Sequence, residues 1–150
     1  MEFHIDPHRG IGPVAFGMTP TEVRREMQHA PRAKGARTDC YLGSSFQVSY
    51  GEDGVEFIEV ASSIEAVVLF DIVDVFDTPA DELLAAIARR DTADPLLSKP
   101  PNQYVFPELI LTLWGRSAQY DHRGNRTRPV FAAVGIGTPG YVAAIRAIKS

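Results

Sequence analysis

The chain has 150 residues, a net charge of −4 and an ordinary globular composition, 45% apolar and 23% charged. A chain of this length buries a sizeable core as one domain, so folding requires neither disulfides nor a metal. The mild acidity argues against a nucleic-acid partner, which needs clustered Lys and Arg, and is compatible with a basic protein partner.

Export and membrane signals are not evident. Cys40 is the only cysteine, so an internal disulfide is excluded. Its simplest interpretation is a small buried side chain. Residues 1–9 lack the apolar run of a signal peptide, and no apolar stretch is long enough to span a bilayer. The expected location is the cytoplasm.

The first helix has the clearest local signal. Residues 11–16 read as a short strand, and Thr19 then offers a hydroxyl as N-cap. Pro20 suits the first helical position, and Glu22 completes a capping box. Pro31 ends the helix, which is too short to be stable without packing on a sheet.

A strand pair follows this helix. Residues 32–39 are polar and basic and read as a loop, whereas residues 46–50 alternate between apolar and polar side chains, as a half-buried strand does. Asp53 and Gly54 favour a tight hairpin. Residues 55–61 are the returning strand.

The second half begins with an apolar run. Its β-branched residues predict a strand over 67–76. Thr78 and Pro79 repeat the helix-start signal, and Asp81 faces the positive helix end. Residues 91–102 contain three prolines and are predicted to be a loop.

The remaining segments predict strands around one long loop. Residues 104–114 form a strand with a break at Pro107. Residues 116–128 are polar and read as a long hairpin tip, and residues 130–136 are the last strand. Residues 142–148 are predicted to form a short terminal helix.

The two halves repeat one another. The matched segments are 19–22 with 78–81, 49–51 with 113–115, and 56–60 with 130–134. Insertions in the loops 91–103 and 116–128 account for the greater length of the second half, and loops accept them at little entropic cost. The sequence therefore predicts one α+β domain made of two tandem helix-strand-strand units, about 10–64 and about 67–141, with an antiparallel sheet and helices on one face.

Two resemblances accompany the repeat. The stretch 10–27, with Gly17-Met18-Thr19-Pro20-Thr21-Glu22-Val23, resembles the helix entry of the β-lactamase inhibitory protein family and of the small outer-membrane lipoprotein A group of the barrel-assembly machinery. Both pack helices on an antiparallel sheet, and the inhibitor has the unit in tandem. Segments 104–115 and 134–141 are similar to a group of uncharacterised bacterial proteins, which implies no activity.

This chain departs from both named families. The inhibitor family is exported and disulfide-bonded, and the lipoprotein group carries an N-terminal lipidated cysteine, a role that Cys40 cannot fill. Neither activity is therefore carried over. What the resemblance implies is a sheet that presents one face to a protein partner.

Residues that are typical of catalysis or metal binding are sparse. His4, Asp6 and His8 share a face if the segment is extended, and such a trio can ligate zinc, but no further ligand cluster accompanies it. No nucleophile motif or phosphate-binding loop is evident. We therefore predict no catalytic residues, no metal and no cofactor.

Aromatic and acidic residues are the better candidates for a function. Tyr and Trp are favoured interface anchors, and a helix-free sheet face would present them, although the same rings fit equally well under a helix. The predicted partner-binding residues are Tyr41, Phe46, Tyr50, Asp71, Asp74, Asp77, Tyr104 and Trp114.

The leading hypothesis is a non-enzymatic protein-binding domain, with an inhibitor or a toxin-neutralising immunity-type protein as its most concrete version. Its partner would be a protein, such as a basic toxin or enzyme. Two alternatives stay open: a small-molecule binder or enzyme that uses a cleft between the two units, and a structural or self-associating subunit.

Overall fold

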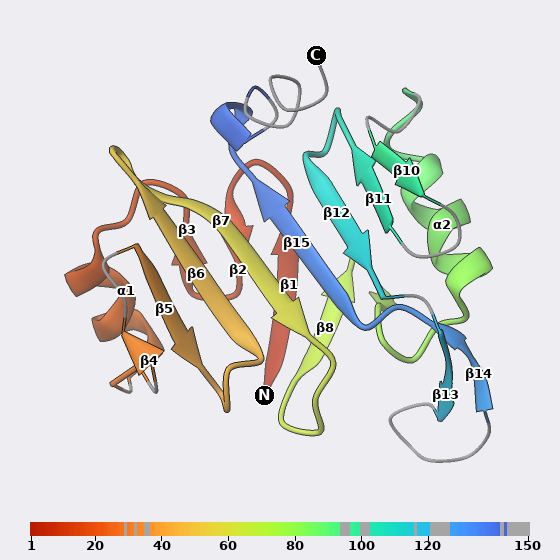
Figure 1. Cartoon of the computed structure of the whole chain (residues 1–150), viewed down its shortest axis with the longest axis horizontal. Coiled ribbons are helices and arrows are strands. Elements are labelled where there is room, and N and C mark those ends of the chain that lie inside the picture. Colours follow the sequence, from red (N-terminus) through yellow and green to blue (C-terminus); the bar gives the residue numbers. More distant parts are fainter. Residues whose placement is uncertain are drawn as a thin grey trace.

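The protein is an α+β molecule, made mostly of strands with few short helices, in the computed structural model (Figure 1). The structure describes residues 1–28, 30–31, 33–34, 37–93, 97–99, 103–115, 117–120, 127–141 and 143. The predicted α+β class is confirmed. Within these residues, no helix is long and apolar enough to cross a membrane.

An antiparallel sheet of eight strands forms the main layer, in the order β10-β11-β12-β15-β7-β6-β5-β4. Its strands are β4 (Ala33–Lys34), β5 (Thr38–Tyr41), β6 (Phe46–Gly51), β7 (Gly54–Ala61), β10 (Leu97–Lys99), β11 (Gln103–Phe106), β12 (Leu111–Trp114) and β15 (Ala133–Gly137). The central strands β7 and β15 come from the two halves of the chain and pair antiparallel. We call this layer the large sheet.

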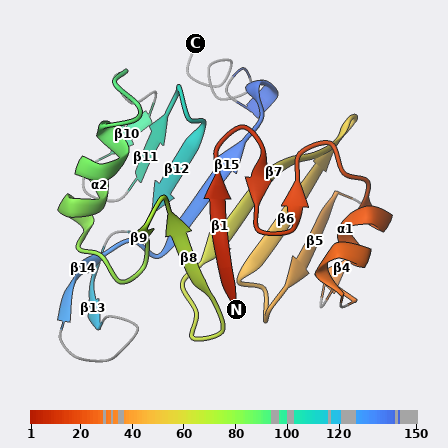
Figure 2. The same ribbon diagram turned by 180° about the vertical axis from the view of Figure 1, so that it is seen from behind.

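A smaller sheet of five strands lies behind the large sheet in Figure 1 and in front of it in Figure 2. It contains β1 (Glu2–Asp6), β2 (Gly10–Ile11), β3 (Val14–Ala15), β8 (Val67–Phe70) and β9 (Val73–Asp74). The strands β1 and β8 pair parallel, and the other described pairs are antiparallel. A separate hairpin joins β13 (Ser117–Tyr120) to β14 (Thr127–Val130).

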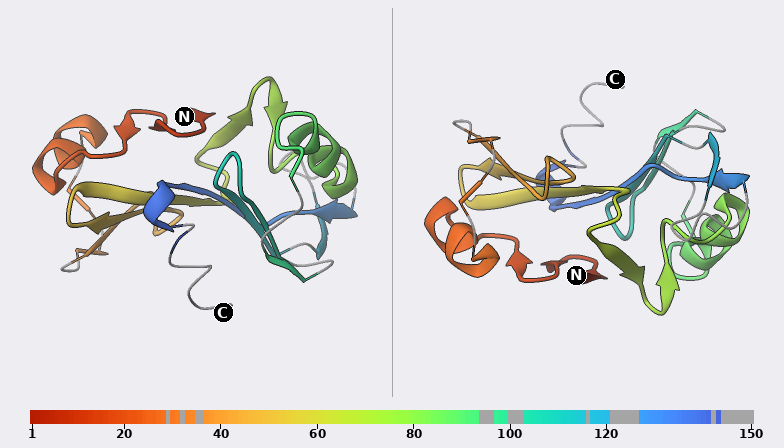
Figure 3. Two further views of the ribbon diagram at one scale, coloured as in Figure 1. Left: turned by 90° about the horizontal axis from the view of Figure 1, so that it is seen from above. Right: turned by 90° about the horizontal axis from the view of Figure 1, so that it is seen from below.

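Two helices, α1 (Pro20–Met27) and α2 (Ala80–Ala88), complete the described fold. Seen edge-on in Figure 3, both helices and the five-stranded sheet lie on the same side of the large sheet. We call the side of the large sheet that they cover the inner face and the opposite side the outer face.

The first helix start agrees with the sequence prediction and the second does not. The Thr19 hydroxyl accepts the N–H of Glu22, and the Glu22 carboxylate accepts the N–H of Thr19, which completes the capping box. At α2 the N-cap is Pro79, with no side-chain cap, so the expected role of Thr78 is wrong. Asp81 does lie in the first turn, where its negative charge interacts favourably with the positive end of the helix dipole.

Several predicted strands are in fact hairpins. The apolar run 67–76 turns back at Asp71, whose φ of 55° is left-handed, so β8 and β9 pair with each other. The segment 11–16 likewise splits into β2 and β3. The last predicted strand is broken after Val130, because β14 and β15 belong to different sheets.

The polar N-terminal segment contains a strand that was not predicted. Phe3 and Ile5 are buried in β1, while Glu2, His4 and Asp6 are exposed. The Phe3 ring packs on Phe46 of the large sheet, with ring centroids 5.1 Å apart. The core therefore lies between the two sheets and under the helices.

Candidate functional site

The pairing register assigns the side chains of the large sheet to its two faces. Alternation along β6 buries Phe46, Val48 and Tyr50, and their partners on β7 include Ile58 and Val60. These positions form the inner face. The residues between them face outward: Gln47 and Ser49 on β6, Phe57 and Glu59 on β7, Gly135 on β15, and Thr112 and Trp114 on β12.

Most of the predicted partner-binding aromatics face the core. Tyr41, Phe46 and Tyr50 are buried on the inner face, so their side chains are not available to a partner. Tyr104 also faces inward and packs against the core from the sheet margin. Trp114 is 56% exposed and is the one predicted aromatic that the register places on the outer face.

The three predicted acidic contacts lie by the small sheet and α2. Asp71 forms an ion pair with Arg90, whose Nη1 lies 2.6 Å from a carboxylate oxygen. Asp74 accepts the backbone N–H groups of Phe76 and Asp77, both at 3.2 Å, and so shapes the approach to α2. These residues are therefore not brought together with Trp114.

A buried ionic cluster fastens α1 to the inner face. Asp39 on β5 is fully buried and accepts two hydrogen bonds from Arg24 of α1, from Nε and Nη2, both at 3.1 Å. The hydroxyl of Tyr50 donates to the same carboxylate at 2.9 Å. Tyr41 lies beside them with a buried hydroxyl that has no partner among the described residues. The paired charges indicate a structural role for this cluster.

The outer face carries a carboxylate, Glu59, whose environment contrasts with that of the fully buried and paired Asp39. Glu59 lies on the central strand β7, between Gln47 of β6 and Gly135 of β15, and Thr112 of β12 follows across the glycine. Its side chain is half-buried, and it has no hydrogen bond or ion pair to another described residue. Burial raises the pKa of the Glu59 carboxyl, because the anion loses hydration without gaining a counter-charge.

A pair of stacked rings stands next to Glu59. Phe57 and Tyr141 lie with ring centroids 4.4 Å apart and planes at 26°. The pair depends on the glycines of β15, because a Cβ at Gly135 would lie 2.6 Å from Phe57 Cζ and one at Gly137 would lie 2.8 Å from Tyr141 Cδ1. Burial and the nearby charge of Glu59 raise the pKa of the Tyr141 phenol.

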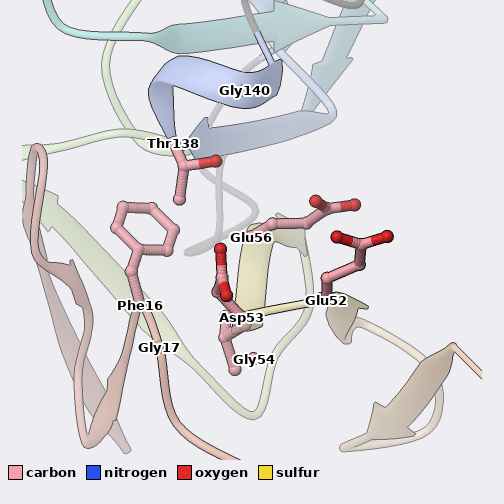
Figure 4. Close-up of a pocket in the computed structure, with 9 residues that line it drawn as sticks. Phe16, Gly17, Glu52, Asp53, Gly54, Glu56, Thr138 and Gly140 are labelled. Carbon is pink, nitrogen blue, oxygen red and sulfur yellow. The ribbon is translucent and has the colours of Figure 1, made fainter.

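An acidic hollow of about 600 Å³ opens at the same end of β7 (Figure 4). Glu52 and Asp53 come from the β6–β7 turn and Glu56 from β7, and Phe16 and Thr138 lie opposite them. The hollow thus joins segments from both halves of the chain. It adds three carboxylates to the margin of the sheet near the Phe57–Tyr141 stack.

Other polar side chains in the described part of the chain have structural roles or stand apart. Buried Asp91 accepts the N–H groups of Glu108 and Leu109, at 2.8 and 3.0 Å, and so holds the β11–β12 turn. His4 pairs with Glu2, and β1 ends before His8, so the predicted face does not extend to that histidine. The described residues contain no group of three or more potential metal ligands.

No family model, curated protein or solved structure shows a significant match to this chain.

Sequence reasoning missed Glu59, although a signal was present. Residues 57–60 alternate, and Ile58 and Val60 were already recognisable as core positions of a strand. A carboxylate between two such residues must lie on the other face of the same strand. Its burial, and its lack of a partner among the described residues, depend on neighbouring strands that are far away in the sequence. Only the structure shows which strands these are.

Proposed function

We propose that this chain is a non-enzymatic protein-binding domain, of the inhibitor or toxin-neutralising type, and that a basic protein docks on the outer face of the large sheet. The observation that carries the proposal is Glu59, a half-buried carboxylate at the centre of that face, which has no partner among the described residues. An unpaired, partly desolvated charge costs stability, and such costs are typical of functional sites.

The surroundings of Glu59 support a basic partner. Exposed Trp114 and the Phe57–Tyr141 stack supply rigid rings of the kind that anchor protein interfaces. The carboxylates of Glu52, Asp53 and Glu56 at the margin add a negative field that would steer a basic partner toward the sheet. The resemblance of the helix entry implies only that one face of the sheet is presented to a protein partner.

We further propose that the fold consists of two tandem units. In the first, α1 is followed by β5, β6 and β7; in the second, α2 is followed by β11, β12 and β15. The sheet order supports this division, since it runs inward from the margin to β7 on one side and to β15 on the other. The outer face would then be one continuous surface across both units.

Site-specific photo-crosslinking in the native host tests the docking face. A benzophenone amino acid at Trp114 should capture a discrete protein, whereas the same probe at Glu26, exposed on α1, should not. Equal capture at both positions, or none at Trp114, would contradict the proposal. Capture of a second copy of this chain at Trp114 would instead support a self-associating subunit.

The acidic hollow favours a second candidate, a binder or enzyme that acts on small cations. Its lining combines three carboxylates with the Phe16 ring and the Thr138 side chain. Thermal-shift measurements with polyamines and cationic metabolites test this alternative, because a ligand that binds only the folded state raises the melting temperature. A shift that is abolished by Glu56→Gln and unchanged by Glu65→Gln would support it.

A further inference from the structure

We propose that the Glu59 carboxylate, with the stacked rings of Phe57 and Tyr141 beside it, is the binding site for one arginine side chain of the protein partner. This inference rests on the proposed function, because it names the group that the outer face recognises. It names the kind of side chain that is recognised, an arginine, and the residue on which the recognition depends, Glu59.

The Phe57 ring lies above Gly135, beside the strand position of Glu59. The cross-strand row on the outer face runs from Gln47 to Glu59, Gly135 and Thr112. The space above Gly135 is filled, since a Cβ there would lie 2.6 Å from Phe57 Cζ and 2.8 Å from the hydroxyl of Thr112, which is itself buried. The Phe57 ring therefore forms a wall beside the carboxylate. An incoming cation would meet the carboxylate and this aromatic wall together.

The charges that face this position favour a cation. Glu59 has no positive neighbour among the described residues, and the neutral Tyr141 phenol supplies no counter-charge. A carboxylate in such a place gains from a charged donor, because charge-assisted hydrogen bonds are about twice as strong as neutral ones. The arginine of the partner would supply the counter-charge that Glu59 does not receive from the described residues.

The aromatic wall selects arginine over lysine. A guanidinium is planar, weakly hydrated and able to lie against a ring while its N–H groups reach a carboxylate. The Phe57–Tyr141 stack is held in place by the glycines of β15 and is therefore a fixed surface. An ammonium is more strongly hydrated and lacks a plane to lay against that surface.

Argininamide is the probe, titrated into the full chain and followed by the backbone amide NMR signals. The signals of residues 57–59, 112 and 135 should shift in a saturable way at millimolar concentrations. Citrullinamide has nearly the same shape but a neutral side chain in place of the guanidinium. It should bind at least about tenfold more weakly, as should lysinamide. Equal binding of citrullinamide would overturn the inference, and equal binding of lysinamide would overturn its preference for arginine.

Two carboxylate-to-amide variants complete the test. Glu59→Gln should weaken argininamide binding at least about tenfold, whereas Glu65→Gln, the same change on an exposed loop, should leave it unchanged. Equal effects of the two variants would overturn the site. Spectra of the free Glu59→Gln variant report whether it folds.

The two proposals fail in different ways. If a partner is captured at Trp114 and Glu59→Gln does not weaken that complex, the arginine site is wrong and the docking face stands. If argininamide binds through Glu59 and no protein is captured, the site stands and the docking function fails. If neither binding is seen, both are rejected.

Discussion

Two carboxylates on opposite faces of the large sheet are treated in opposite ways. Asp39 on the inner face is fully buried, yet it has a two-point ion pair with Arg24 and a hydrogen bond from Tyr50. Glu59 on the outer face is only half-buried and has no partner among the described residues. The deeper charge is the better satisfied one.

The difference separates a charge that is paired within the fold from one that has no partner among the described residues. Asp39 loses all its hydration, and only full pairing makes that tolerable, so its cluster holds α1 on the sheet. Glu59 loses part of its hydration and has no partner among the described residues. Its charge is therefore expected to lower the stability of the fold.

The largest effect is expected from breaking the inner cluster. Asp39→Asn keeps the shape but removes a fully buried carboxylate that accepts hydrogen bonds from Tyr50 and from Arg24, whose side chain is 28% exposed. Each hydrogen bond to a charged group contributes about 1.5 to 3 kcal/mol, so a loss of roughly 3 kcal/mol is expected. Urea denaturation measures the loss of unfolding free energy. The control Asp71→Asn breaks the exposed pair with Arg90 and should cost less than about 1 kcal/mol. Similar losses for both variants would mean that Asp39 has no special role.

Two tyrosines of the same cluster sharpen the comparison within the inner face. Tyr50→Phe removes a hydrogen bond to a charged group and should cost about 1.5 to 3 kcal/mol. Tyr41→Phe removes a buried hydroxyl without a partner among the described residues, so it should be neutral or stabilising. Equilibrium denaturation at pH 7 separates the two, and equal costs would contradict the assigned hydrogen bonds.

The dependence of the unfolding free energy on pH in the alkaline range provides a second test of the Tyr50 hydrogen bond. Burial, together with the hydrogen bond to Asp39, raises the pKa of Tyr50 well above its usual value of 10.0. The stabilisation from the neutral phenol is therefore complete below pH 10 and is lost as pH rises, because the unfolded chain releases its proton first. The unfolding free energy of Tyr50→Phe should fall less steeply above pH 10 than that of the unaltered chain.

The smallest effect has the opposite sign and concerns Glu59. Glu59→Gln removes an unpaired, half-buried charge and should raise the unfolding free energy at pH 7 by less than about 1 kcal/mol. Because burial raises the pKa of this carboxyl, the cost of its charge is present at neutral pH and disappears as the group is protonated. The advantage of the variant should therefore shrink on acidification and vanish below the ordinary value of 4.5.

The same change at Glu65 controls for general charge effects, since that residue is exposed on the β7–β8 loop. Denaturation curves at pH 4 and pH 7 for both variants decide the matter. A loss of stability in Glu59→Gln at pH 7 would show that the carboxylate is satisfied, and the contrast with Asp39 would fail.

Local chemistry made part of the fold predictable. The capping box of Thr19 and Glu22 and the Asp53-Gly54 hairpin were correct because each depends on residues a few positions apart. The strand over residues 2–6 was missed although its alternation was visible, because the charged residues of that segment dominated its interpretation. The hairpin in 67–76 was missed because Asp71 takes a left-handed conformation that apolar periodicity does not encode.

The faces of the sheet show where sequence reasoning ends. Alternation correctly placed the apolar residues Phe46, Val48 and Tyr50 of the segment 46–50 on one side. It did not say which side the helices cover, because that depends on packing between distant segments. The aromatic residues Tyr41, Phe46 and Tyr50 were therefore considered as contacts when they are core, and Glu59 was not considered at all.

The central pairing of β7 with β15 also has a consequence for how the protein is made. A ribosome delivers β6 and β7 early, and their hairpin can close from neighbouring residues. The far side of β7 must wait until almost the whole chain has emerged, because its other partner is β15. During that interval β7 is an unprotected strand edge, open to mispairing with other nascent chains. The charge of Glu59 on this strand disfavours such encounters during synthesis.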